Sequence, residues 1–176
     1  VPLLASRLAV VTHPGVAAAL QEDYPEAHIR CAPLPVQAIH AMQRAEHPGK
    51  AIFGVLADDR VDVVRRAFAH ACDAGAEAVL LVESVERVMR QADVILLLNW
   101  PGFGRPQTLA LAAMGCGKPV VVLETEASAD WPALNPQTWQ PRGSGAAAPV
   151  AVSIDLRDEE HSLGVAIRRL AADAAL

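Results

Sequence analysis

One short loop, which follows the most hydrophobic run of the chain, gathers two glycines, two prolines and an arginine. It belongs to "NWPGFGRPQTLALAAMGCGKPVVV", residues 99–122, and leads into a helix of small residues. The first backbone N–H groups of a helix have no partner inside it and suit a phosphate. Gly102 and Gly104 let the backbone approach a ligand, Thr108 adds a hydroxyl, and Arg105 can bind phosphate bidentately. The loop therefore predicts a phosphate site, and the alternative is an ordinary Gly/Pro connection with Arg105 in solvent.

A second candidate is "FGVLADDR", residues 53–60, where a strand turns into a helix. Gly54 would admit a ligand close to the backbone, and Arg60 is long enough to reach an anion. Asp58 and Asp59 also fit as ordinary helix caps, and their charge would repel phosphate. Both interpretations stay open for this segment.

The glycines match no established nucleotide fingerprint. "GFGRPQ" lacks the third glycine of a dinucleotide-binding loop. "GCGKP" is not a Walker loop, because no Ser or Thr follows Lys118 and Ala112 stands where the first glycine belongs. A nucleotide-binding reductase or kinase is therefore disfavoured.

Charge and composition exclude several other classes of function. The net charge is -5, and no basic block provides the clustered Lys and Arg of a nucleic-acid surface. The six histidines and three cysteines show no metal-binding spacing, so no metal site is predicted. The cysteines are expected to be buried thiols of a reducing compartment, the cytoplasm. No nucleophile–base pair is evident.

Apolar runs alternate with helical patterns along the chain. The runs are continuous rather than alternating, which is typical of strands buried on both faces of a sheet. They span residues 7–12, 28–32, 51–56, 77–83, 93–99, 118–124 and 149–154. Helices are predicted in residues 58–75, 84–92, 106–117 and 158–175. Ser84 is a candidate N-cap, Gly75 a candidate stop, and Gly115 or Gly117 ends the third helix.

This order predicts an α/β protein: a Rossmann-like, doubly wound parallel sheet flanked by helices. Residues 51–176 would form that domain, and residues 1–50 an interdomain segment with a short strand and helix packing on it. Residues 125–148 are predicted to be a long surface loop pinned by Trp131 and Trp139. No apolar stretch reaches the roughly 18 residues of a membrane span. The start at Val1, without a signal peptide, suggests an excised piece of a longer chain.

Four segments in the right order resemble the GT4 type of GT-B glycosyltransferases. "ADVILLLNWPGFGRPQTLALAAMGCGKPVVV" is similar to the late donor-site segment, and "AIFGVLADDRVDVVRRAFAHA" to the entry strand and helix. "RLAVVTHPGVAAALQEDYPEAHIRCAPLPV" looks like the interdomain segment, and "EASADWPAL" echoes a later stretch. The resemblance covers most of residues 5–173.

The resemblance implies the C-terminal half of a GT-B fold, which binds a nucleotide-sugar donor as a substrate and needs neither a cofactor nor a metal. An N-terminal acceptor domain would be missing, so this fragment alone would be inactive. Carried over by position, the family's loop glycine falls on Gly104, its glutamate on Arg105 and its diphosphate-contacting lysine on Arg60. Arg60 and Arg105 would then neutralise charge on the leaving group. Substrate contacts are assigned to Gly54, Asn99, Gly104, Gln107, Thr108 and Leu109.

The chain departs from the family pattern at the donor carboxylates. Arg105 replaces one glutamate and Ala112 the later one, and neither accepts hydrogen bonds from sugar hydroxyls. The passage from residue 83 to residue 93 is also too short for the family's additional strand and helix. These departures favour the alternative function, a degenerate, non-catalytic Rossmann-like scaffold or protein-interaction module.

Overall fold

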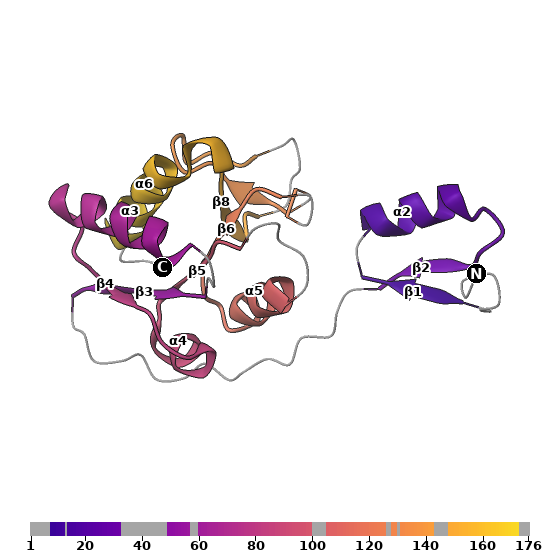
Figure 1. The fold of residues 1–176 in the computed structure, drawn as a ribbon, viewed down its shortest axis with the longest axis horizontal. Coiled ribbons are helices and arrows are strands. Elements are labelled where there is room, and N and C mark those ends of the chain that lie inside the picture. The colour runs from indigo at the N-terminus through magenta and orange to yellow at the C-terminus, as the bar shows by residue number, and fades with distance from the viewer. Residues whose placement is uncertain are drawn as a thin grey trace. The chain divides into compact units, whose positions relative to one another are not determined.

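The structure is a computed structural model with two compact units, Val1–Val36 and Gln37–Leu176 (Figure 1). It describes residues 8–12, 14–32, 49–56, 60–99, 105–125, 128–129, 131–142 and 148–172, with only the backbone at 14 and 105–107.

The first unit is a small β-α-β motif. Strand β1 (Ala9–Val11) and strand β2 (Ile29–Cys31) pair in parallel, and helix α2 (Pro14–Asp23) connects them. The Gln21 amide holds the turn after α2, because its Nε2 donates to the carbonyls of Pro25 at 3.0 Å and Ala27 at 3.2 Å. Both strands predicted here are confirmed.

The second unit contains a six-stranded sheet, and all of its strands are parallel. The order across the sheet is β4-β3-β5-β6-β8-β7. The strands are β3 (Ala51–Val55), β4 (Ala78–Leu81), β5 (Val94–Leu97), β6 (Val120–Leu123), β7 (Ala133–Leu134) and β8 (Ala151–Ile154). This sheet confirms the predicted Rossmann-like, doubly wound α/β fold.

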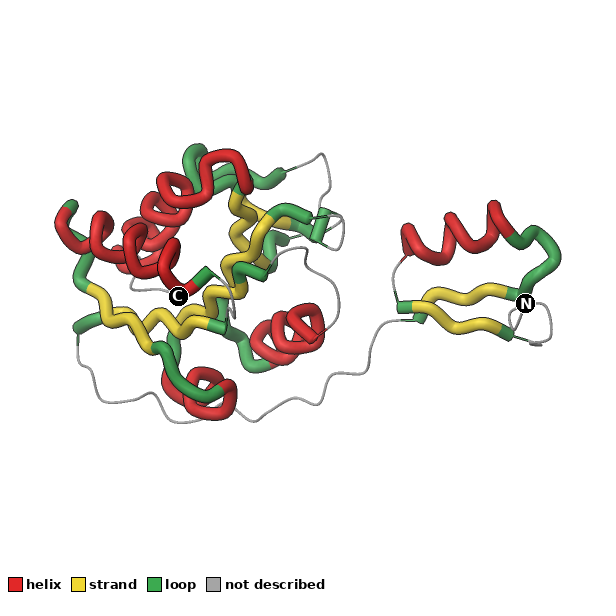
Figure 2. The backbone as a smooth tube through the Cα atoms, in the orientation of Figure 1, coloured by secondary structure: helices red, strands yellow, loops and turns green. Residues whose placement is uncertain are grey.

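Helices cover both faces of the sheet. They are α3 (Val61–Asp73), α4 (Val85–Gln91), α5 (Arg105–Gly115) and α6 (Glu159–Ala172), with a short 3₁₀ helix η1 (Leu156–Asp158) before α6. Helices α3 and α6 lie on one face, and α4 and α5 on the other (Figures 1 and 2). This two-sided cover explains why the strand sequences are continuously apolar.

Successive side chains of each strand alternate between two cores. In β3, Phe53 and Val55 face the core under α3 and α6. Ile52, and Leu56 just after the strand, belong to the core under α4 and α5. Aliphatic side chains dominate both cores, and the Phe53 ring meets the Phe68 ring edge-on, with centroids 6.1 Å apart.

The end signals Ser84, Gly75 and Gly117 are confirmed. The N-cap position of α3 is Arg60, whose side chain makes no capping hydrogen bond, and the candidate caps Asp58 and Asp59 lie outside the described residues. Ser84 caps α4 by accepting a hydrogen bond from the Arg87 amide. Gly75 and Gly117 adopt left-handed backbone, at φ +95° and φ +71°, directly after α3 and α5. At both sites the amides of the glycine and of the residue after it donate to carbonyls in the last turn of the helix, as in a Schellman motif. Glycine is favoured there because it has no Cβ to clash.

The expected long loop at residues 125–148 is only partly a loop, which corrects the prediction. It contains β7, whose Ala133 is 2% exposed and pairs with Ala151 of β8. Trp131 and Trp139 pack against the two cores, as expected. A two-residue strand leaves too short a pattern for sequence periodicity to detect.

Gly54 lies in β3 where the Val88 and Ala92 side chains pack against the sheet. A Cβ at this position would lie 2.5 Å from Val88 Cγ1 and 2.6 Å from Ala92 Cβ. The close approach that this glycine permits is therefore made by α4. The packing of α4 accounts for the glycine at this position, and the ligand contact assigned to Gly54 stays a prediction.

We expect Gly54→Ala to lower the free energy of unfolding by about 1–3 kcal/mol, because the new methyl group overpacks the contact with α4. Urea denaturation followed by circular dichroism measures this change. The control is Gly164→Ala in α6, where the new Cβ would lie 3.5 Å from the Ala67 carbonyl oxygen, an ordinary contact. A fully stable Gly54→Ala variant would contradict the packing described for α4.

The amino edge of the sheet holds a half-buried lysine. The Asp93 carboxylate accepts a hydrogen bond from the Ile52 amide at 2.9 Å, and Lys118 Nζ donates to the carbonyl of Ala92. Burial lowers the pKa of Lys118 below its usual 10.5, although the nearby Asp93 and Cys116 act in the opposite direction. Folding therefore favours the neutral amine.

This shift predicts how stability depends on pH. Between the lowered pKa of Lys118 and 10.5, the unfolded chain binds more protons at this amine than the folded protein does. The free energy of unfolding of the wild type, relative to that of Lys118→Met, should therefore rise as the pH increases toward 10.5. Urea denaturation of both proteins across this range checks the sign, and a falling difference would refute it.

Candidate functional site

The candidate site lies at the carboxyl edge of the sheet, between the neighbouring strands β3 and β5. The chain leaves β3 toward α3 on one face and leaves β5 toward α5 on the other. Such a reversal is a topological switch point, where open α/β sheets bind their ligands. The fold thus brings the described parts of both segments, 53–56 with Arg60 and Asn99 with 105–109, to one edge of the sheet.

Asn99 follows β5 and connects the two strand ends. Its Nδ2 donates to the carbonyl of Leu56 at 3.3 Å, and the Leu56 amide donates to the carbonyl of Leu96 at 2.9 Å. The side chain is half-buried. Asn99 therefore lies at the switch point, as the assignment of a substrate contact requires, and it also holds the end of β3 in place.

Helix α5 begins at Arg105, so its first turn lies just past the carboxyl end of β5. Within residues 105–107, Arg105 and Gln107 have backbone N–H groups, whereas Pro106 has none. Gly104 and the side chains of Arg105 and Gln107 lie outside the described residues. Thr108 is exposed in the first turn.

Leu109 has a different environment from the other members of the predicted set. Its side chain is half-buried and packs against the core under α4 and α5. Its amide also lies beyond the first turn, where helix amides bond to the preceding carbonyls. These contacts argue against a phosphate contact at Leu109 and indicate a packing role.

Arg60, expected to be a free cation for a diphosphate, is engaged with Glu159. The Arg60 guanidinium donates from Nη1 to Glu159 Oε2. The Arg60 side chain is 20% exposed and that of Glu159 is 10% exposed, so the pair is largely desolvated. Arg60 Nε is buried and has no hydrogen-bond partner among the described residues.

The Arg60–Glu159 pair joins the start of α3 to the start of α6. Negative charge is favourable at the N-terminus of α6, whereas the positive charge of Arg60 opposes the dipole of α3. The Glu159 carboxylate therefore offsets the positive charge of Arg60, which the dipole of α3 disfavours at the start of that helix. A phosphate at this position would have to share Arg60 with Glu159 or displace the carboxylate.

A second ion pair holds the segment before β8 to the sheet. Arg142 Nη1 donates to Glu124 at the end of β6 and to Ser153 Oγ in β8, at 3.3 Å. Sequence reasoning identified neither Arg142 nor Glu159 as partners. Arg142 and Glu124 are 18 positions apart, and Arg60 and Glu159 are 99 positions apart. Only the packing of the elements brings the members of each pair together.

Within the described part of the chain, no group of three or more His, Cys, Asp or Glu side chains is suited to a metal ion.

Cys31 is exposed, and Cys72 and Cys116 are half-buried, which corrects the expectation of three buried thiols. No helix in the described ranges has the length and apolar character needed to cross a bilayer.

Comparison of the chain with protein-family models and with curated proteins finds no match. The glycosyltransferase family therefore stays a resemblance of short sequence segments.

We expect Arg60→Ala to lower the free energy of unfolding by about 2 kcal/mol, because it leaves the Glu159 carboxylate buried without its cation. A double-mutant cycle with Glu159→Ala should give a coupling energy of at least about 1 kcal/mol.

The matched control is the Arg66–Glu160 pair, which joins the same two helices at 2.9 Å with side chains 56% and 36% exposed. Water screens this pair, so its coupling energy should be smaller, about 0.2–1 kcal/mol. Equal coupling in the two cycles would show that desolvation does not strengthen the Arg60–Glu159 pair.

Proposed function

We propose that the carboxyl edge between β3 and β5 binds the diphosphate of a nucleotide sugar, as the donor domain of a glycosyltransferase. The observation that carries this proposal is that α5 is the helix that follows β5 and Asn99 at the switch point of the sheet. Unpaired amides of a helix N-terminus suit phosphate oxygens, and the helix dipole adds to their attraction. The ordered resemblance of four segments to the GT4 type supports the choice of substrate.

The chemistry proposed for this site is electrostatic. Negative charge develops on the diphosphate as the glycosidic bond to the sugar breaks, and the amides of Arg105 and Gln107 would stabilise that charge. The Arg105 guanidinium would add a positive charge. Arg60 would contribute after it shares or exchanges its pairing with Glu159, so donor binding and the Arg60–Glu159 pair would compete.

The proposed donor domain requires an acceptor domain, as in the family that it resembles. Under this proposal the acceptor would bind on a preceding domain of a longer chain, and the present chain would bind the nucleotide without turning over substrate. The partners would then be a small-molecule nucleotide sugar and the acceptor domain.

The second candidate function is a non-catalytic scaffold or protein-interaction module. The Arg60–Glu159 pair favours it, because the cation assigned to the diphosphate already has a carboxylate partner. The absence of glutamates at positions 105 and 112 favours it as well, since donor hydroxyls would lack acceptors there.

Titration of the isotope-labelled protein with UDP and GDP distinguishes the two functions. The donor-domain proposal predicts chemical-shift changes in residues 54–60 and 99–109 at millimolar nucleotide, and weaker changes with the nucleosides, which lack phosphate. A protein that shows no shift in these segments with either nucleotide would support the scaffold.

Two variants at one position test the helix amides themselves. Arg105→Ala removes the guanidinium, whereas Arg105→Pro removes the guanidinium and the backbone N–H. Proline fits the first position of a helix, so both variants should fold. The proline variant should bind UDP about tenfold more weakly than the alanine variant, the effect of one hydrogen bond to a charged group. Equal affinities of the two variants for UDP would show that the Arg105 amide does not bind the nucleotide.

A further inference from the structure

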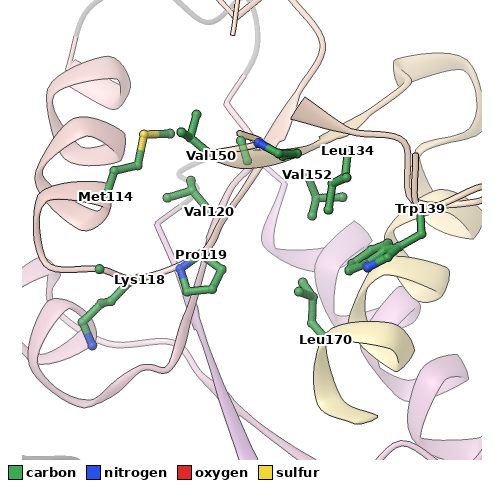
Figure 3. A pocket seen from close by; sticks show the side chains of 12 residues that line it. Met114, Lys118, Pro119, Val120, Leu134, Trp139, Val150, Val152 and Leu170 are labelled. Carbon is green, nitrogen blue, oxygen red and sulfur yellow. The ribbon is translucent and has the colours of Figure 1, made fainter. Parts of the chain in front are cut away.

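A cavity of about 400 Å³ opens at the amino edge of β6 and β8, the opposite edge of the sheet from the proposed phosphate site. Elements far apart in the sequence contribute its walls: the end of α5, the residues before β6 and β8, the end of β7, and α6 (Figure 3). Its volume is within the range of small-molecule sites.

The side chains around the cavity are almost all apolar. They include Met114, Pro119, Leu134, Trp139, Val150 and Leu170. Lys118 is the ionisable residue of the lining, and its amine donates to the carbonyl of Ala92 and turns away from the cavity in Figure 3. A space with such walls gives water few hydrogen bonds and favours an apolar occupant.

Trp139 has an unusual backbone conformation for a residue that lines a cavity. Its φ is +58°, in the left-handed region that bulky residues rarely adopt. Asn135 enforces this turn: its Oδ1 accepts the amides of Gln137 at 2.8 Å and Thr138 at 3.0 Å. The Trp139 amide donates to the carbonyl of Asn135 at 2.8 Å. Glycine or asparagine would adopt this backbone conformation at lower cost. The tryptophan at this position therefore indicates a role for its ring.

The indole ring is also held from outside. The Arg169 guanidinium lies over it, 5.4 Å from the ring centroid, and donates to the carbonyl of Gln137 at 2.6 Å. Figure 3 shows the ring extending from its loop toward Leu170 and the cavity. The structure thus presents a fixed aromatic ring at one end of an apolar space.

We propose that this cavity is a second binding site, for a small uncharged compound of one or two rings. A flat ring would pack against the Trp139 indole and the aliphatic walls. An uncharged compound fits best, because the walls are apolar and the amine of Lys118 donates to the Ala92 carbonyl. The site is independent of the nucleotide-sugar proposal, because it lies at the other edge of the sheet.

The test uses N-phenyl-1-naphthylamine, an uncharged two-ring compound whose fluorescence rises in apolar surroundings. We expect saturable binding of one molecule per chain, with energy transfer from tryptophan. Val150→Asp introduces a carboxylate at the rim and should weaken binding at least about tenfold. The matched control is Val82→Asp after β4, because Val150 and Val82 are 43% and 41% exposed. This control should bind the probe as the wild type does.

Trp139→Asn provides a second variant, because asparagine keeps the left-handed turn and removes the ring. It should also weaken probe binding and lower the energy transfer, to which Trp100 and Trp131 still contribute, while circular dichroism remains that of the folded protein. Three results would overturn the proposal: no saturable binding to the wild type, equal loss in Val150→Asp and Val82→Asp, or unchanged binding in folded Trp139→Asn.

Discussion

Burial of a parallel sheet on both faces is the constraint on which the rest of this structure depends. Each central strand sends alternate side chains into two separate cores, so each face requires helices that pack closely against it. Gly54 shows how tight this packing is, because α4 occupies the space where a Cβ would lie. Because helices cover both faces, the connections that leave β3 and β5 run in opposite directions across the sheet, toward β4 and β6. The candidate phosphate site lies at that change of direction, so the position of the site follows from the packing of the core.

The Arg60–Glu159 pair shows how one side chain can serve either stability or binding. A desolvated guanidinium at a helix N-terminus needs a compensating negative charge, and Glu159 supplies it. A diphosphate could supply the same compensation. The two interactions therefore compete for one cation, and their relative strength distinguishes a domain that binds a donor from one that has become a scaffold. The first turn of α5 would not face this competition, because backbone amides, and not a side chain already paired with a carboxylate, would bind the anion there.

The two edges of the sheet differ in chemistry. The carboxyl edge has helix N-termini, Asn99 and the Arg60–Glu159 ion pair, so polar and charged groups dominate it. At the amino edge, the cavity around Trp139 has apolar walls. A parallel sheet produces this asymmetry, because all strands, and therefore all following helices, point the same way. Under the two proposals, one domain would carry an anion site and an apolar site at opposite edges of its sheet.

Local and periodic features were determined by the sequence itself. Continuous apolar runs predicted the longer strands, and Ser84, Gly75 and Gly117 marked helix ends, because these signals depend on neighbouring residues only. Tertiary structure alone decided the pairing of Arg60 with Glu159, the contact of Gly54 with α4, and the two-residue strand β7. Each of these requires elements distant in the chain to meet. The sequence therefore indicated which segments could bind an anion, whereas the packing of α3 against α6 determined which cation is already paired.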